Sequence, residues 1–287
     1  MTVYSTLDAA LSHLSASTTR TPLAVLLAED RVELKSSLDH LARIGFTEIL
    51  LLGAVQPEPD APEGVSLLSV PHRLTRLEDS IALLNRVIPA VAGRWIHYCF
   101  NAEYLYFPFL ETRSISDALT FVEEERRQSV FTCAIDLYAD DLSVAPGGVD
   151  RARACFDKSG YYAQTRHADG VPLPQQVDVY GGLRWRFEEH IPWDRRRIDR
   201  ISLFIAAPDL QLDTDFQLRT PEHDTVSCPW HHNMTMCVCS FRVAKALRHN
   251  PGSRAHVTNF RWSGSEPFRW SSMQLMEHGF MEPGQWF

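Results

Sequence analysis

Short apolar runs alternate with longer segments of helical spacing over the first half of the chain. Four runs of six mostly apolar residues predict buried strands at 23–28, 48–53, 65–70 and 95–100. Apolar residues three or four positions apart predict helices at 6–16, 34–44, 76–92 and 114–128. Strands that are apolar on both faces are typical of a parallel sheet covered by helices on each side. The pattern therefore predicts strand–helix–strand units with right-handed connections.

The second half follows a different pattern. From Ser129 the apolar period changes to two, which is typical of a strand with two unlike faces. Further strands are predicted at 177–187 and 198–206, and a helix is predicted at 232–248. This half is therefore expected to form a mixed sheet with long loops.

No linker separates the two halves, so we predict one domain over residues 1–287. Its α/β half spans residues 21–128, and its loop-rich lobe of mixed sheet spans residues 129–287. The predicted fold class is α/β, with a mostly parallel sheet flanked by helices.

Charge and composition limit the function classes. The chain has 36 acidic and 28 basic residues, a formal charge of −8, so a phosphate backbone would be repelled overall and nucleic acid is not an expected partner. No apolar run approaches the roughly 20 residues that span a bilayer, and the N-terminus lacks a secretory signal pattern. We therefore expect a cytoplasmic protein with no transmembrane segment. The six cysteines lie mostly in apolar segments, which favours reduced core thiols.

A polar triplet, Asn101-Ala102-Glu103, follows the apolar run at 95–100. In open α/β sheets ligands bind beyond the carboxyl ends of the strands, near the point where the strand order reverses. The triplet therefore predicts the active-site edge. The alternative is that Asn101 and Glu103 only carry the chain out of the sheet into solvent.

These features resemble the family-2-like glycosyltransferases of the GT-A fold, which is related to the Rossmann fold, and in particular a bacterial branch related to glycan-modifying enzymes. The resemblance covers about three-quarters of the chain. It is carried by Ala28-Glu29-Asp30, by Trp95 to Pro108, by Gly181 to Arg186, and by Cys228-Pro-Trp-His-His232 before a Ser-Phe-Arg helix. It implies an enzyme, a hexosyltransferase-like glycosyltransferase, that moves a sugar from a nucleotide-diphosphate donor to a glycan, lipid-linked or small-molecule acceptor.

The resemblance also implies binding residues. Glu29 and Asp30 would hold the base and ribose of the nucleotide sugar. In the family an Asp-x-Asp motif binds a divalent metal. Here Asn101-Ala102-Glu103 stands in its place or, in an ungapped register through Pro108, Phe100 and Ala102 do. An amide oxygen and a carboxylate suit Mg²⁺ or Mn²⁺, which prefer oxygen ligands.

The segment Trp230-His231-His232 adds candidates for the same chemistry. His231 or His232 would complete the metal site or touch the diphosphate, and Trp230 would stack on a sugar ring. The alternative for each histidine is a packing or capping role in a loop.

Glycosyl transfer requires stabilisation of the departing diphosphate and a carboxylate that removes the acceptor's proton. Arg184 and Arg186 alternate along the strand predicted at 177–187, so both would project to one face and grip phosphate oxygens. The alternative is a solvated, ion-paired strand face. The candidate bases are the acids that follow: Glu188, Glu189 and Asp194.

Other interpretations stay open. A catalytically silent relative would bind carbohydrate or a partner protein without transferring sugar, and a nucleotidyltransferase on the same sheet would lack its usual Gly-rich phosphate loop. Thiolate and imidazole ligands from Cys228, His231 and His232, with Cys237 and Cys239, would form a structural zinc site. On the predicted helix, however, Cys237 and Cys239 diverge by about 200°. Asp136 and Tyr138 share one face of the strand that starts at Ser129 and are candidates for an acceptor groove.

Overall fold

The computed structural model describes residues 1–286 except 57, 219, 221–222, 224–225 and 227–231. The chain forms two compact units, each assembled from separate segments. Unit 1 comprises Met1–Tyr104, Thr112–Phe131 and Ile201–Asp224, and unit 2 comprises Leu105–Glu111, Thr132–Arg200 and Thr225–Phe287. The prediction of a single domain stays a prediction.

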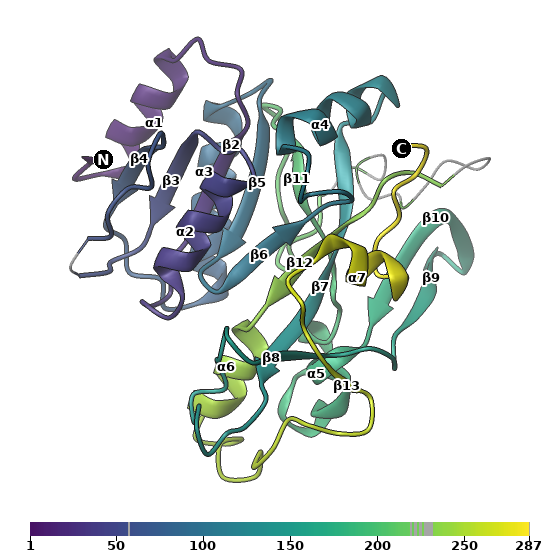
Figure 1. Cartoon of the computed structure of the whole chain (residues 1–287). Coiled ribbons are helices and arrows are strands. Elements are labelled where there is room, and N and C mark those ends of the chain that lie inside the picture. Colours follow the sequence, from purple (N-terminus) through teal and green to yellow (C-terminus); the bar gives the residue numbers. More distant parts are fainter. Residues whose placement is uncertain (57, 219, 221–222, 224–225, 227–231, 287) are drawn as a thin grey trace. The chain divides into compact units, whose positions relative to one another are not determined.

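Unit 1 holds the predicted parallel sheet. Its elements are β1 (Thr2–Val3), α1 (Leu7–Ala16), β2 (Leu23–Leu27), α2 (Leu34–Arg43), β3 (Glu48–Leu52), β4 (Ser66–Val70), α3 (Leu77–Ala90), β5 (Trp95–Phe100) and α4 (Ile115–Glu124). The strands lie parallel in the order β1-β4-β3-β2-β5, and helices flank them (Figure 1). The four predicted strands and four predicted helices of the first half are confirmed, and so is the α/β fold class.

Three strands run from one unit into the other: β6 (Glu103–Tyr106), β7 (Ser129–Ala139) and β11 (Asp199–Ile205). In unit 1, the end of β11 pairs antiparallel with β5, with Leu203 opposite His97. The sheet order of unit 1 reverses between β2 and β5, because β3 and β4 extend from one side of β2 and β5 lies on the other. Such a reversal is where α/β sheets bind ligands.

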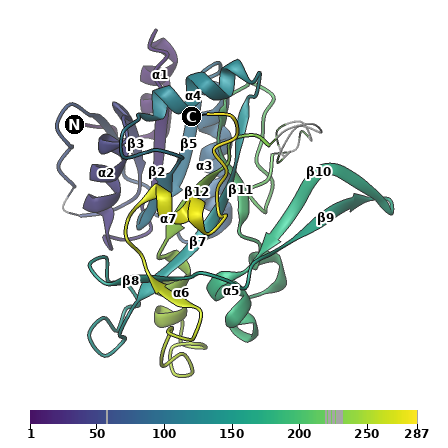
Figure 2. The ribbon, with the colours of Figure 1, turned by 45° about the vertical axis from the view of Figure 1, so that its right-hand side comes forward.

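Unit 2 is a smaller mixed sheet with a hairpin and short helices. Its further elements are β8 (Ala154–Asp157), β9 (Tyr162–Ala168), β10 (Val171–Tyr180), α5 (Gly182–Arg186), the single 3₁₀ turns η1 (Glu188–His190) and η2 (Trp193–Arg195), β12 (Met236–Ser240), α6 (Arg242–His249), β13 (Ser265–Pro267) and α7 (Ser272–Glu277). Strand β12 lies parallel to β7, β8 lies antiparallel to it, and β13 pairs with β8. Figure 2 shows β9 and β10 as a two-stranded ribbon.

The strand predicted at 177–187 is wrong beyond Tyr180, where the short helix α5 begins. Gly181 and Gly182 cause the change, because their φ angles of 153° and 64° are ones that favour glycine. Gly181 also needs to lack a side chain, since a Cβ there would lie 2.3 Å from the Tyr161 ring. Arg184 and Arg186 therefore lie on a helix, and the prediction that they alternate along a strand is wrong.

The helix predicted at 232–248 is wrong in its first half, where β12 is a strand. All five residues of β12 are buried, so the strand lacks the alternation that separates a strand from a helix in sequence. Cys237 and Cys239 consequently share a face of a strand and do not diverge. Both are free, fully buried thiols, which confirms the prediction of reduced core cysteines for this pair.

The core of unit 2 fixes the place of α5. Leu183 is fully buried in a cluster with Tyr138 of β7, Cys155 of β8 and Leu247 of α6. Burial of a leucine side chain contributes about 2 kcal/mol, so this one residue anchors the helix, while Trp185 of the same helix is 40% exposed. In the described part of the chain, none of the helices has the length and apolar character that crossing a bilayer requires.

Candidate functional site

The reversal point of unit 1 brings together three predicted site residues: Glu29, Asp30 and Asn101. The Asn101 carboxamide is fully buried and its oxygen accepts a hydrogen bond from the Glu29 backbone N–H at 2.9 Å. Its Nδ2 donates to Asp30 Oδ1 at 2.7 Å and to the Val32 carbonyl at 2.9 Å. Asn101 therefore closes the connection that leads from β2 to α2, and Glu29 alone of the three is exposed.

Glu103 lies nearby in the chain but points back into the fold. Its carboxylate is 2% exposed and accepts a hydrogen bond from the Phe100 backbone N–H at 2.9 Å. Asn101 and Glu103 thus turn their polar groups toward the chain, which does not fit a divalent ion held at an exposed sheet edge. Among the residues that the structure describes, no group of three or more His, Cys, Asp or Glu side chains is placed to hold a metal.

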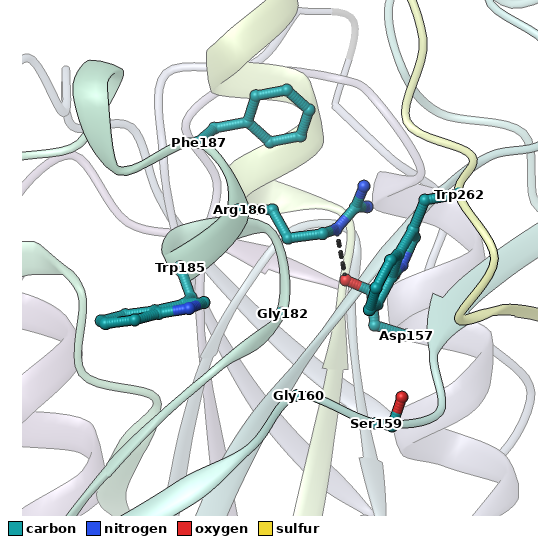
Figure 3. A pocket seen from close by; sticks show the side chains of 8 residues that line it. All are labelled: Asp157, Ser159, Gly160, Gly182, Trp185, Arg186, Phe187 and Trp262. Carbon is teal, nitrogen blue, oxygen red and sulfur yellow. Dashed lines mark hydrogen bonds and ion pairs between the residues drawn. The ribbon is translucent and has the colours of Figure 1, made fainter.

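Unit 2 contains a pocket of about 590 Å³ between α5 and the β8–β13 region. It is lined by Asp157, Ser159, Gly160, Gly182, Trp185, Arg186, Phe187 and Trp262. Figure 3 shows Trp185 and Trp262 on opposite sides, with the ion pair of Arg186 and Asp157 on the same side as Trp262. Each tryptophan is 40% exposed, so aromatic surface is available to a ligand.

Asp157 organises this pocket. Its Oδ2 accepts from Arg186 Nε at 2.7 Å, and its Oδ1 accepts from Trp262 Nε1 at 2.7 Å and from the Tyr138 hydroxyl at 2.5 Å. The side chain of Asp157 is 2% exposed and that of Arg186 is 18% exposed. Such a partly desolvated ion pair fixes both the guanidinium and the indole in place.

Arg186 is held on two further sides. Its NH2 group donates to the Phe260 carbonyl at 2.7 Å, and its guanidinium carbon lies 5.3 Å from the centre of the Trp262 ring. The cation therefore stacks on the indole while it pairs with the carboxylate. The pocket consequently combines an aromatic wall with a fixed charged pair.

A second acid, Asp136 of β7, lies buried behind Gly182. Its Oδ2 would be 3.0 Å from a Cβ at Gly182, and its Oδ1 lies 3.5 Å from Arg184 Nε. Burial raises the pKa of Asp136 to about 6, although the nearby Arg184 charge acts in the opposite direction. The Tyr161 hydroxyl has no hydrogen-bond partner in the described part of the chain. Its pKa is raised, mainly by burial and to a smaller extent by the nearby Asp157 charge.

The predicted bases lie elsewhere on unit 2. Glu188, Glu189 and Asp194 are exposed and do not line the pocket. Glu188 pairs with Arg196 at 2.8 Å, and Asp194 pairs with Arg195 at 3.2 Å. Their role as a catalytic base stays a prediction.

The remaining predictions concern the segment before β12. Trp230 and His231 lie outside the described residues, as does Cys228, so the structure places none of them. His232 is described and exposed.

Sequence reasoning missed Asp157, Trp262 and the role of Trp185 as a pocket wall. Two signals were available. An acid ends the apolar run Ala154-Cys155-Phe156, and a Gly-Gly pair directly precedes Leu-Arg-Trp-Arg. The pairing of Asp157 with Trp262 joins residues 105 positions apart, and no local pattern predicts such a contact.

No family model matches this sequence, and no curated protein matches it. Solved structures are similar at low identity. A 2-C-methyl-D-erythritol 4-phosphate cytidylyltransferase from Francisella tularensis is 9% identical, with 66% of this chain and 74% of that chain covered and a TM-score of 0.29. A putative glucose-1-phosphate thymidylyltransferase from Bacillus anthracis, in complex with sucrose, is 8% identical, with 82% and 80% covered and a TM-score of 0.27.

A UDP-glucose pyrophosphorylase from Acinetobacter baumannii is 8% identical, with 91% of this chain and 92% of that chain covered and a TM-score of 0.30. Likenesses of this strength assign no family to the chain. The resemblance to family-2-like glycosyltransferases stays a prediction.

Proposed function

We propose that the chain is a glycosyltransferase that uses a nucleotide sugar, and that the pocket of unit 2 receives a saccharide ring. One observation carries the proposal: two exposed tryptophans line a pocket that also holds a fixed Arg186–Asp157 pair. A saccharide ring has apolar C–H faces and a hydroxyl-bearing edge. Aromatic side chains suit the faces, and charged hydrogen-bonding groups suit the edge.

The size of the pocket supports the same ligand class. Its volume of about 590 Å³ falls in the range of roughly 300–1,000 Å³ that small-molecule sites occupy. Arg186, whose side chain is 18% exposed, is a donor to sugar hydroxyls, and the buried Asp157 holds it in place. Neither needs to move on binding, because each is held by hydrogen bonds within unit 2.

The donor nucleotide is assigned to the sheet edge of unit 1, at the reversal between β2 and β5. Glu29 is exposed there, and Asp30 is oriented by hydrogen bonds from Val32 N–H and Asn101. Mg²⁺ or Mn²⁺, when bound, would neutralise charge on the donor diphosphate. Because Asn101 and Glu103 do not fit an exposed ion, no step of the proposal depends on that metal.

Binding and transfer measurements test the proposal together. Isothermal titration with sugar nucleotides and free saccharides, with and without Mn²⁺, is expected to find a donor and an acceptor. The Trp262→Ala variant is expected to bind the acceptor at least about tenfold more weakly. The matched control is Trp270→Ala, which removes a unit 2 tryptophan outside the pocket that stacks on Arg151. Failure of every donor and every saccharide to bind would reject the proposal.

A second candidate is a carbohydrate-binding protein without transferase activity. The observation that favours it is the use of the Asn101 amide and the buried Glu103 carboxylate in the chain's own hydrogen bonds. Saccharide binding with no release of nucleoside diphosphate from any donor would select this candidate over the first.

A further inference from the structure

Four aromatic side chains continue from the wall of the pocket along unit 2. We call Trp185, Tyr162, Tyr180 and Trp193 the aromatic strip. Trp185 lines the pocket, and its ring centre lies 5.2 Å from that of Tyr162. Tyr162 stacks on Tyr180 at 5.2 Å, and Tyr180 stacks on Trp193 at 5.4 Å. The rings therefore form one unbroken series that starts inside the pocket.

The fold builds this series from three separate elements. Tyr162 and Tyr180 are opposite each other in the β9–β10 hairpin, Trp185 is on α5, and Trp193 is in η2. Opposite residues of an antiparallel pair have their Cβ atoms about 5 Å apart, so the two tyrosine rings meet without distortion. The hairpin thus holds the strip in a fixed register.

Three of the four rings of the aromatic strip are exposed. Tyr180 is 4% exposed and forms its base, whereas Trp185 and Tyr162 are 40% exposed and Trp193 is 59% exposed. The strip therefore offers two exposed aromatic patches, Trp185 with Tyr162 and, beyond the buried Tyr180, Trp193. Scattered apolar residues on a surface are ordinary, but closely spaced exposed aromatic rings mark a binding site. Rigid aromatic rings also lose little conformational entropy when they are covered.

The charges beside the strip are balanced. Arg196 pairs with Glu188 at 2.8 Å and lies 5.5 Å from the Trp193 ring, and Arg195 pairs with Asp194. Arg197 pairs with Asp178 at 3.1 Å. Because each of these guanidinium groups already has an acid, the surface suits an uncharged ligand better than a phosphate polymer.

We infer that the aromatic strip binds successive sugar rings of a neutral oligosaccharide whose terminal ring occupies the pocket. The acceptor class is therefore a glycan chain and not a free monosaccharide. This inference rests on the proposed function, since it takes the pocket as a saccharide site. Trp185 belongs to both surfaces, so a chain that enters the pocket meets the strip directly.

The test measures how affinity depends on chain length. Titrations use the malto-, cello- and chito-oligosaccharide series from one to six sugar units. The wild type is expected to gain about tenfold in affinity for at least one series as the chain grows beyond the pocket. Trp193→Ala, at the end of the strip away from the pocket, is expected to remove that gain and to leave the affinity for the shortest ligand unchanged. Trp270→Ala is the control, and circular dichroism confirms that each variant is folded.

The outcomes separate this inference from the proposed function. If short saccharides bind and affinity does not rise with length, the inference is wrong and the proposed function stands. If no saccharide binds, the inference is wrong, and the proposed function is wrong as well if no sugar nucleotide binds. If Trp193→Ala instead disrupts a dimer, or abolishes binding of an oligonucleotide, the strip serves another partner and the inference is likewise wrong.

Discussion

The sheet rim of unit 1 and the pocket of unit 2 both gather acidic side chains, but they use them differently. At the sheet edge of unit 1, the Asn101 carboxamide is hydrogen-bonded to Glu29, Asp30 and Val32, so these hydrogen bonds within the fold occupy its polar atoms. In the pocket, Asp157 and Arg186 are also paired, yet aromatic surface remains exposed around them. The comparison shows that a polar residue at a strand end does not identify a site by itself, and that the surface left available to a ligand does, here that of Trp185, Trp262 and Arg186.

The largest expected effect is in the pocket. Asp157→Ala removes an acceptor shared by Arg186, Trp262 and Tyr138, and it leaves a guanidinium that is only 18% exposed without its carboxylate. Breaking a buried ion pair by removing one partner costs about 3 kcal/mol or more. Urea denaturation followed by circular dichroism measures this loss.

Asp157→Asn is the matched variant, because it keeps the shape and one acceptor oxygen while it removes the charge. We expect it to lose less stability than Asp157→Ala. A loss below about 1 kcal/mol for the alanine variant would show that the pair does not organise the pocket.

Units 1 and 2 also differ in how much of their structure could be predicted from the sequence. The parallel sheet of unit 1 was predictable, because β2, β3 and β5 are short apolar runs and α2 and α3 carry apolar stripes between them. That Asn101 lies at the reversal point was predictable for the same reason. The hydrogen bonds that occupy the Asn101 carboxamide were not predictable, since they depend on how the connection after β2 folds back onto it.

Unit 2 was harder to predict, because long-range pairing decides its structure. Strand β12 is buried on both faces and reads equally well as part of a helix. The pocket depends on Trp262 meeting Asp157, and the aromatic strip depends on the register between Tyr162 and Tyr180. The Gly181-Gly182 pair was the one local signal that the chain turns there.

The next effect concerns pH and the buried acid of unit 2. Burial raises the pKa of Asp136 from 3.8 to about 6. A carboxyl that is harder to ionise when folded stabilises the protein most below its unfolded pKa, and this contribution is lost as the pH rises through about 6. The shift corresponds to about 3 kcal/mol.

Asp136→Asn cannot ionise, so its stability relative to the wild type should rise by about 3 kcal/mol between roughly pH 4 and pH 7.5. Urea unfolding at a series of pH values measures the difference. Asp39→Asn, which removes an exposed acid of α2, is the control for loss of one charge. A difference that does not vary with pH would mean that Asp136 does not titrate in this range.

A smaller effect is expected at the rim of unit 1. Asn101→Ala removes the acceptor of the Glu29 N–H and one of the donors to the Asp30 carboxylate, which should cost about 2 kcal/mol. Asn101→Asp should cost at least as much, because it places a second carboxylate against Asp30. Thermal unfolding in the presence and absence of Mn²⁺ checks both variants. If Mn²⁺ restores the thermal stability of Asn101→Asp but not that of Asn101→Ala, the result would support the predicted metal site. The sheet edge of unit 1 would then be a ligand site, as the pocket of unit 2 is proposed to be.

The smallest effect is the difference in stability between two glycine variants, which tests whether the pocket needs a residue without a side chain at Gly182. Its φ of +64° is strained for alanine, and a Cβ there would lie 3.0 Å from Asp136 Oδ2. Gly170 in the β9–β10 turn has a φ of +79° and no atom within 4 Å of its Cβ position. Gly170→Ala therefore measures the cost of backbone strain alone, without a steric clash. Gly170→Ala should cost about 1 kcal/mol of stability, and Gly182→Ala should cost about 1 kcal/mol more.

Because Gly182 lines the pocket and Gly170 does not, only Gly182→Ala should also weaken saccharide binding. Equal losses of stability in the two variants would mean that Asp136 yields to the added methyl group, and the buried acid would then not be rigidly held behind the pocket.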